Sequence, residues 1–140
     1  MERTSIKITS DTLNLQDCTN FVDDASCGGV VLFVGTVRNS TKNKTVNLLE
    51  FSAYEPMAVK ELQKIADKAL TLFPIYKIAI HHAVGKLKIG EVPVIIAVSS
   101  AHRKAAFEAC EFAIDTLKET VPIWKKEYFD DGEIWVNSHP

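Results

Sequence analysis

Basic residues gather where a helix is expected to begin. Ser100 can cap that helix, and three residues later, where glutamate would suit the positive end of the helix dipole, stands Arg103, directly after His102. Positive side chains at a helix N-terminus are unfavourable unless they share an anion with the free backbone N–H groups. The pattern therefore indicates a phosphate or carboxylate site. The structural alternative is that the aliphatic stem of Arg103 covers apolar residues while its guanidinium reaches solvent.

Three further basic residues are candidates for a reactive site. Arg38 follows an apolar strand where a loop opens, so a rigid strand would hold its base. Lys118 lies near the end of a predicted helix, and Lys125 directly follows Trp124, whose packing against the core would fix the backbone. A lysine held among other cations can have a lowered pKa and act as acid, base or nucleophile. Each of the three could instead be an ordinary solvated charge.

The remaining reactive residue types indicate neither a metal site nor a cofactor. His81 and His82 are neighbours on a predicted strand and must point to opposite faces, so we expect structural roles for both. The three cysteines are an odd number without a C-x-x-C motif, which argues against a disulfide framework or zinc site. Motifs typical of serine hydrolases, P-loop enzymes, dinucleotide binders and zinc proteases are absent from the sequence.

Composition limits the class of protein further. The chain has 140 residues, of which 46% are hydrophobic, and we expect one domain spanning residues 1–140. The net charge of -2 does not suit a general nucleic-acid binder, so any anion site must be local. The sequence has neither the roughly 18-residue apolar stretch of a membrane helix nor the apolar start of a secretory signal. We expect a soluble protein of the cytosol that binds no membrane.

Apolar residues at helical spacing predict three helices that would carry these side chains. The first covers residues 13–25. The second starts at Glu55 and Pro56, since proline is tolerated in the first helical turn, and Pro74 closes it. The third runs from about residue 102 to residue 120, because Pro122 disfavours helix in the residue before it. Its predicted apolar stripe consists of Phe107, Cys110, Ile114 and Leu117.

Apolar runs rich in β-branched residues predict the strands. These cover residues 6–8, 30–34, 46–54, 75–83, 94–98 and 134–136, and a short hairpin-like piece lies between Gly85 and Gly90. Residues 30–34 are apolar on both faces, which suits a central, fully covered strand. Residues 39–45 are polar without periodicity and should form a mobile surface loop. The element order indicates an α+β fold, with a mixed or antiparallel sheet and helices packed mainly on one side.

Four segments, read together, resemble the large subunit of molybdopterin synthase, the MoaE family. They are FVGTVRN at 33–39, YEPMA at 54–58, SSAHR at 99–103 and VPIWKKE at 121–127. In this order they cover nearly the whole chain from about Gly28 and form a highly specific set. The resemblance implies a fold of the α/β-hammerhead type.

The resemblance also implies an activity and partners. The family's large subunit is a sulfurtransferase of molybdenum cofactor biosynthesis, acting on cyclic pyranopterin monophosphate without a cofactor. A small ubiquitin-like sulfur-carrier subunit would supply sulfur as a C-terminal Gly-Gly thiocarboxylate, and two large subunits would form a homodimer within a heterotetramer. Lys118 and Lys125 match the family's catalytic positions. The matching substrate-binding positions are Thr36, Val37, Arg38, His102, Arg103, Lys118, Lys125, Lys126 and Glu127.

The implied reaction agrees with the placement of the basic residues. A phosphate ester explains positive charge at a helix start, and thiocarboxylate addition requires proton transfers and stabilisation of an oxyanion. We expect Lys118 to act as acid, base or covalent participant and Lys125 as its electrostatic partner. Two other readings are a non-catalytic domain that binds a phosphorylated metabolite and a scaffold without affinity for small molecules. Neither explains why the four segments occur together.

Overall fold

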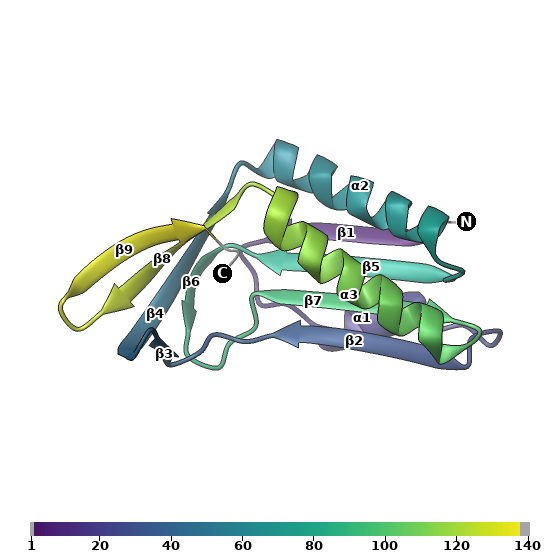
Figure 1. Ribbon diagram of the computed structural model, residues 1–140, viewed down its shortest axis with the longest axis horizontal. Coiled ribbons are helices and arrows are strands. Elements are labelled where there is room, and N and C mark those ends of the chain that lie inside the picture. Colours follow the sequence, from purple (N-terminus) through teal and green to yellow (C-terminus); the bar gives the residue numbers. More distant parts are fainter. Residues whose placement is uncertain (1, 138–140) are drawn as a thin grey trace.

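The computed structural model describes residues 2–137, which form two β-sheets and three helices (Figure 1). The main sheet has the strand order β1 (Thr4–Thr9), β5 (Lys77–Ala83), β7 (Val94–Ser100) and β2 (Gly29–Gly35). β1 and β5 are parallel, and the other neighbouring strands are antiparallel. The second sheet has the order β3 (Ser40–Thr41), β4 (Lys44–Ala53), β8 (Ile123–Phe129) and β9 (Gly132–Asn137), with β6 (Gly85–Lys88) also paired to β4.

The two long helices lie side by side on one face of the main sheet. α2 (Glu55–Leu72) packs on β1 and β5, and α3 (Arg103–Thr120) packs on β7 and β2 (Figure 1). The short α1 (Leu15–Val22) covers the other face of β5 and β7. The predicted α+β fold with a mixed sheet and helices mainly on one side is therefore confirmed. No helix in the described part of the chain is long and apolar enough to cross a membrane.

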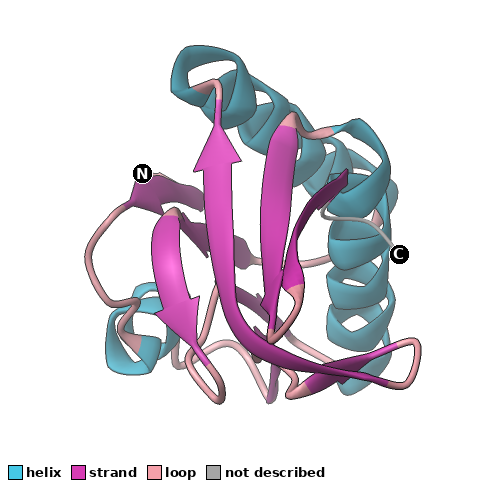
Figure 2. Cartoon of the chain, turned by 90° about the vertical axis from the view of Figure 1, so that its left-hand side faces the viewer, coloured by secondary structure: helices cyan, strands magenta, loops and turns pink. Residues whose placement is uncertain are grey.

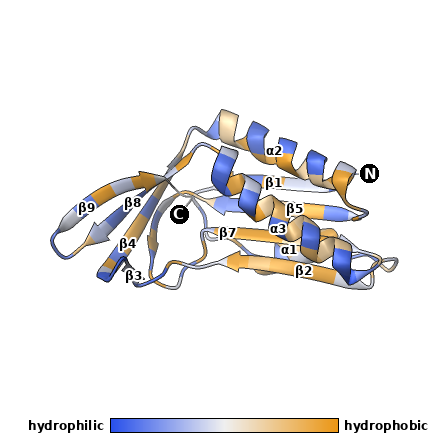
Figure 3. Ribbon diagram, viewed as in Figure 1, coloured by the Kyte–Doolittle hydropathy of each residue, from blue (hydrophilic) through white to orange (hydrophobic). Residues whose placement is uncertain are grey.

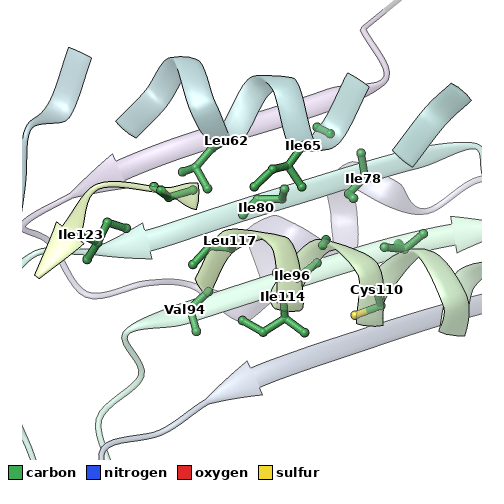
Figure 4. Close-up of a cluster of buried hydrophobic side chains, with 14 of the residues drawn as sticks. Leu62, Ile65, Ile78, Ile80, Val94, Ile96, Cys110, Ile114, Leu117 and Ile123 are labelled. Atoms are coloured by element: carbon green, nitrogen blue, oxygen red, sulfur yellow. The ribbon is translucent and has the colours of Figure 1, made fainter. Parts of the chain in front are cut away.

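Strands β5 and β7 are buried on both faces because successive side chains in a strand point in opposite directions. One face packs under α2 and α3 and contributes Ile78, Ile80, Val94, Ile96 and Val98 to the main core (Figure 4). The other face meets Cys18 and Val22 of α1 through Ala79, Ile95 and Ala97. The strand predicted over residues 75–83 is thus covered on both sides, although the alternation of Tyr76, Ile78 and Ile80 with Lys77 and Ala79 predicts a half-buried strand.

The buried side of α3 consists largely of small residues. Ala106, Ala109 and Ala113 are fully buried, which lets the helix axis approach the sheet closely. Ile114 and Leu117 then fill the space beside Val94 at the end of the helix (Figure 4). The predicted stripe is correct for Cys110, Ile114 and Leu117. It is wrong for Phe107, which is 59% exposed because the alanines occupy the arc that faces the sheet.

Strand β2 is hydrophobic along its length (Figure 3) but lies at the edge of the main sheet. Val31 and Phe33 pack under α3, whereas Val30, Leu32 and Val34 on the opposite face are 38–44% exposed. α1 covers only β5 and β7 on that face. The prediction of a central strand covered on both sides is therefore wrong, since an apolar pattern does not say what covers it.

Residues 39–45 form a tight hairpin instead of the predicted mobile loop. Ser40 pairs with Thr45 and Thr41 pairs with Lys44, so β3 and β4 are joined by two residues. Lys42 and Asn43 adopt positive φ values of 48° and 67°, the left-handed backbone that two-residue hairpin turns require. Figure 2 shows this hairpin at the end of the long β4 strand. The polar composition of residues 39–45 predicted a connecting loop, but it did not predict the strand pairing on either side of the turn.

Candidate active site

A cavity of about 310 Å³, here called the inner cavity, lies where the second sheet meets the main sheet. The end of β2, the start of β7, the last turns of α3 and strands β4 and β8 enclose it. The apolar part of its walls consists of Phe33, Leu49, Phe51, Pro93, Val94, Ile114 and Leu117. Charged groups that are partly buried against these walls are less screened by water, which strengthens their electrostatic interactions with a bound molecule.

Four charged side chains border the inner cavity: Arg38, Lys118, Lys125 and Glu127. Lys118 lies in the last turn of α3, and Arg38 follows β2. Lys125 and Glu127 alternate along β8 and therefore share the face that points inward, together with the buried Ile123. The structure thus brings together residues that are separated by up to 89 positions in the sequence.

The anchor of β8 differs from the one predicted. Ile123 is 2% exposed and fills the core beneath the strand, whereas Trp124 is 43% exposed. The indole therefore does not hold the backbone of Lys125 in place. The pattern of β8 alternates, so only one of two adjacent apolar residues can face the core, and the smaller one does.

The environment of Lys125 lowers its pKa. Burial against the apolar walls is the largest cause, and the positive charges of Arg38 and Lys118 act in the same direction, while Glu127 opposes them. The side chain is half-buried, so it remains accessible to a ligand in the cavity. A lysine whose ammonium form is destabilised in this way is suited to proton transfer or to stabilising a developing negative charge.

Glu127 is held in a defined position by the hairpin. Its carboxylate is 6% exposed, and the hydroxyl of Thr41 in β3 donates a hydrogen bond to Oε2 over 3.1 Å. Thr41 also lines the inner cavity, although the predicted catalytic and substrate-binding positions include no residue between 39 and 45. No motif could have shown this contact, because it joins residues 86 positions apart.

A second, wider depression, here called the outer groove, opens beside the inner cavity with a volume of about 950 Å³. Arg38, Thr41, Lys125 and Glu127 border both spaces, so these residues stand between them. The far side of the outer groove consists of Ser40, Lys42, Asn43, Trp124, Trp135 and Val136. A chain lying in the groove would reach the charged residues of the inner cavity.

The predicted anion site at the start of α3 is separate from the inner cavity. His102 and Arg103 line a shallow depression with Gly28, Ala101 and Lys104. Arg103 and Lys118 lie at opposite ends of α3, about 22 Å apart along its axis at a rise of ~1.5 Å per residue. Within one chain, the predicted substrate-binding residues therefore fall into two groups.

The cap of α3 is also not the one predicted. His102 is the N-cap, it makes no side-chain capping bond, and Arg103 is the first helical residue. Ser100 is still part of β7, and its hydroxyl donates to the carbonyl oxygen of His102 over 2.5 Å. The first turn contains no acidic residue, so the positive helix end and three basic side chains face the same depression.

Two further predicted positions do not border the inner cavity. Val37 is 3% exposed and packs in the main core, although its neighbour Thr36 lines the cavity. Lys126 points to the opposite face of β8, where it pairs with Glu133 at 3.1 Å and lies 4.8 Å from the ring centroid of Trp135. We interpret both as supports for the neighbouring residues on their own segments.

The two adjacent histidines point to opposite faces, as predicted. His81 contacts Cys18 of α1, with 3.3 Å between Nδ1 and Sγ, and Ser5 of β1, with 2.9 Å between Nε2 and Oγ. His82 lines the inner cavity. The sequence pattern predicts a structural role for His82 and contains no signal for its place in the cavity.

A cavity that combines apolar walls with two lysines and an arginine, on an α+β scaffold, has the features of a small enzyme's active site. Comparison with known proteins gives the family. The family model described as MoaE protein matches residues 8–120. The chain belongs to the MoaE family.

Relatives in distant organisms match most of the chain. It is 47% identical over 129 residues to the molybdopterin synthase catalytic subunit 1 of Aedes aegypti, covering 91% of this chain and 83% of that protein. It is 46% identical to the molybdopterin synthase catalytic subunit of Bacillus subtilis, covering 97% and 85%. These matches confirm the function expected from the sequence, that of an enzyme of molybdopterin synthesis.

Solved structures share the fold. Molybdopterin synthase from Staphylococcus aureus superposes with a TM-score of 0.87 at 40% identity, covering 97% of this chain and 98% of that one. A complex of subunits 1 and 2 of the molybdopterin-converting factor from Helicobacter pylori gives a TM-score of 0.76 at 25% identity, covering 99% and 94%. The second structure shows that a relative assembles with another subunit.

Proposed function

We propose that this chain transfers sulfur from the thiocarboxylated tail of a small carrier subunit to cyclic pyranopterin monophosphate. The observation that carries the proposal is the convergence of Lys118, Lys125 and Arg38 on one apolar cavity. The thiocarboxylate sulfur would attack a substrate carbon, a carbon–oxygen bond there would break with protonation of the departing oxygen, and the new carbon–sulfur bond would join carrier and substrate through a thioester. Water would then release the carrier carboxylate through a tetrahedral oxyanion and leave the sulfur on the substrate.

The cavity residues suit the steps of this reaction. Lys118 serves as the acid, base or covalent participant, because it reaches the cavity from the end of α3. Lys125 stabilises the oxyanion. Burial and two neighbouring cations destabilise its ammonium group, and a negative charge that develops beside it offsets this effect. Thr36 and Arg38 bind the substrate at the end of β2, and Glu127 keeps the ammonium group of Lys125 directed inward.

The outer groove is the proposed path of the carrier tail. A C-terminal Gly-Gly segment has no side chains, so it can lie flat between the hairpin and Trp124 and place its terminal sulfur beside Lys125. Lys42 and Arg38 supply positive charge for an anionic tail. The complex of two subunits in the Helicobacter pylori relative supports such a partner.

A homodimer would unite the two groups of predicted substrate-binding residues. Gly28 donates a backbone hydrogen bond to Ala101, so the start of β2 lies beside His102 and Arg103, whereas its other end leads to Arg38 and the inner cavity. We place a two-fold axis near Leu32, on the exposed apolar face of β2. The β2 strands of the two chains would then run antiparallel, with the start of one beside the end of the other. Each inner cavity would then receive the partner's Arg103. Two such dimer sites, each with one carrier subunit, give the proposed heterotetramer.

The cytosol is the compartment we propose for this reaction. Cys18, Cys27 and Cys110 all lie in the described part of the chain and are unpaired thiols. Cytosolic redox conditions keep such thiols reduced.

The deciding experiment mixes the purified chain, thiocarboxylated carrier subunit and cyclic pyranopterin monophosphate. Dithiolene product is followed after oxidation to a fluorescent pterin. We expect product only when all three components are present. No product, with folding and carrier binding demonstrated, would favour a non-catalytic domain that uses Arg38, His102 and Arg103 to bind a phosphorylated metabolite.

A further inference from the structure

His82 is a polar residue in the wall of the inner cavity that the proposed reaction has not used. It stands next to the end of β5, on the same face of the strand as Ile78 and Ile80, and is 3% exposed. Its ring meets the ring of Phe51 edge to face, with 5.4 Å between centroids and an interplanar angle of 69°. The position of the imidazole is therefore fixed by packing before any ligand arrives.

The hydrogen bonding of His82 determines which ring nitrogen carries the proton. Nδ1 lies 2.7 Å from the carbonyl oxygen of Ala83, and because a carbonyl can only accept, Nδ1 must be the donor. In the neutral ring, Nε2 then has a free lone pair. Among the described residues, nothing forms a hydrogen bond with Nε2. Burial lowers the pKa of His82 to about 4, so the ring is neutral at pH 7.

A neutral, buried acceptor differs from the charged groups of the cavity, and also from the hydroxyl of Thr36, which is exposed. Arg38, Lys118 and Lys125 are donors only, and Glu127 is an acceptor that already receives a bond from Thr41. The cations suit the phosphate and the developing oxyanion. They cannot satisfy the N–H and O–H groups that a reduced pterin ring also presents, and an unsatisfied donor in an apolar cavity is costly.

We propose that His82 is a specificity-determining residue whose Nε2 accepts a hydrogen bond from an N–H or O–H group of the substrate in the inner cavity. The inference rests on the proposed function, because the pterin ring supplies the donor. It assigns His82 to recognition and not to proton transfer. A ligand of similar size and charge without a donor at this position would bind less tightly to the wild-type enzyme.

The test compares two variants of nearly equal shape, His82→Gln and His82→Met, in the assembled enzyme with a carrier that ends in an ordinary carboxylate. Both lose the ring contact with Phe51, but only glutamine keeps an acceptor. Calorimetric titration with cyclic pyranopterin monophosphate should show about tenfold weaker binding for His82→Met and a change of about threefold or less for His82→Gln. Equal weakening in both variants would mean that His82 only fills space, and would overturn the proposal.

A wild-type measurement removes any dependence on how the variants fold. In enzyme labelled with ¹⁵N-histidine, the resonance of the unprotonated Nε2 of His82 should move when the substrate is added, while inorganic phosphate alone should leave it unchanged. A resonance that stays in place although the substrate binds would also overturn the proposal. Wild-type enzyme that binds no cyclic pyranopterin monophosphate at all would instead contradict the proposed function, on which the inference rests.

Discussion

Lys118 and Lys125 reach the same cavity from different elements and in different surroundings. Lys118 projects from the last turn of α3, where the helix dipole favours a positive charge. Lys125 stands on β8, where burial and two neighbouring cations lower its pKa. Lys125 therefore holds its proton less firmly than an ordinary lysine, and the two side chains meet at one cavity from different local environments.

Replacing Lys118 by alanine should abolish nearly all turnover without unfolding the protein. Loss of a positioned acid or base lowers rates by about 10²–10⁴-fold, and the half-buried side chain contributes little to the core. Single-turnover product formation measures the rate, and a thermal melt measures the fold. Lys68→Ala, on the exposed side of α2, is the matched control and should keep full activity. An active Lys118→Ala enzyme would refute the assignment.

The lowered pKa of Lys125 predicts a pH dependence. As the pH rises through that lowered value, the ammonium group loses its proton and can no longer stabilise an oxyanion, so turnover should fall on the alkaline side. Arginine keeps its charge at any accessible pH, so Lys125→Arg should move this fall to higher pH, even if its maximum rate is lower. The kcat profile between pH 7 and about pH 10 tests this. A profile that does not move would show that Lys125 does not set the alkaline limit. Lys60→Arg, at an exposed position of α2, serves as the control and should leave the profile unchanged.

At the scale of elements, the β3–β4 hairpin supports the site through a single side-chain contact. Thr41 donates to the buried carboxylate of Glu127, which in turn borders Lys125. Because the hairpin turn is tight and its strands are paired, this donor is held in place without a ligand. The polar segment of residues 39–45 thus contributes Thr41 to the wall of the inner cavity.

Thr41→Val should destabilise the protein and impair catalysis together. Valine keeps the shape of threonine but removes a bond to a charged acceptor, which costs about 1.5–3 kcal/mol. Urea unfolding measures the stability, and initial rates measure the activity. Thr45→Val is the matched control, because Thr45 is exposed, lies opposite Ser40 in the same hairpin and borders neither the inner cavity nor the outer groove. Unchanged stability in Thr41→Val would show that water replaces the hydroxyl at Glu127.

At the scale of the whole molecule, the proposed dimer depends on the exposed apolar face of β2. Leu32→Glu places a charge at the centre of the proposed two-fold interface and should convert the dimer into monomers. Light scattering after size-exclusion chromatography distinguishes the two states. Ile89→Glu, an equally exposed apolar residue beyond β6, should remain dimeric. A dimeric Leu32→Glu protein would place the interface elsewhere.

Mixed dimers test whether two chains build one site. If each site uses Lys118 of one chain and Arg103 of the other, then Lys118→Ala and Arg103→Ala chains, each nearly inactive alone, should regain activity when co-expressed. Half of the random dimers are mixed and contain one intact site of two, so about a quarter of wild-type activity is expected. No recovery, with mixed dimers confirmed by mass spectrometry, would mean that both residues act within the same chain.

Local sequence determined the elements and the family of this protein. Periodic apolar residues predicted all three helices and most strands, because the repeats of 3.6 and 2 residues depend only on the backbone. Four segments, at residues 33–39, 54–58, 99–103 and 121–127, were sufficient for the family, and the resemblance then gave the list of candidate residues. Helix ends were less accurate, since Ser100 remained in β7 and left His102 as the cap.

Tertiary structure alone decided which of these residues meet. Alternation shows which side chains share a face but not what covers that face, so the edge position of β2 and the exposure of Trp124 could not be read from the sequence. The contact of Thr41 with Glu127 and the place of His82 in the inner cavity depend on pairings between distant segments. The length of one rigid helix separates Arg103 from Lys118, because a helix rises by a fixed amount per residue whatever its side chains are.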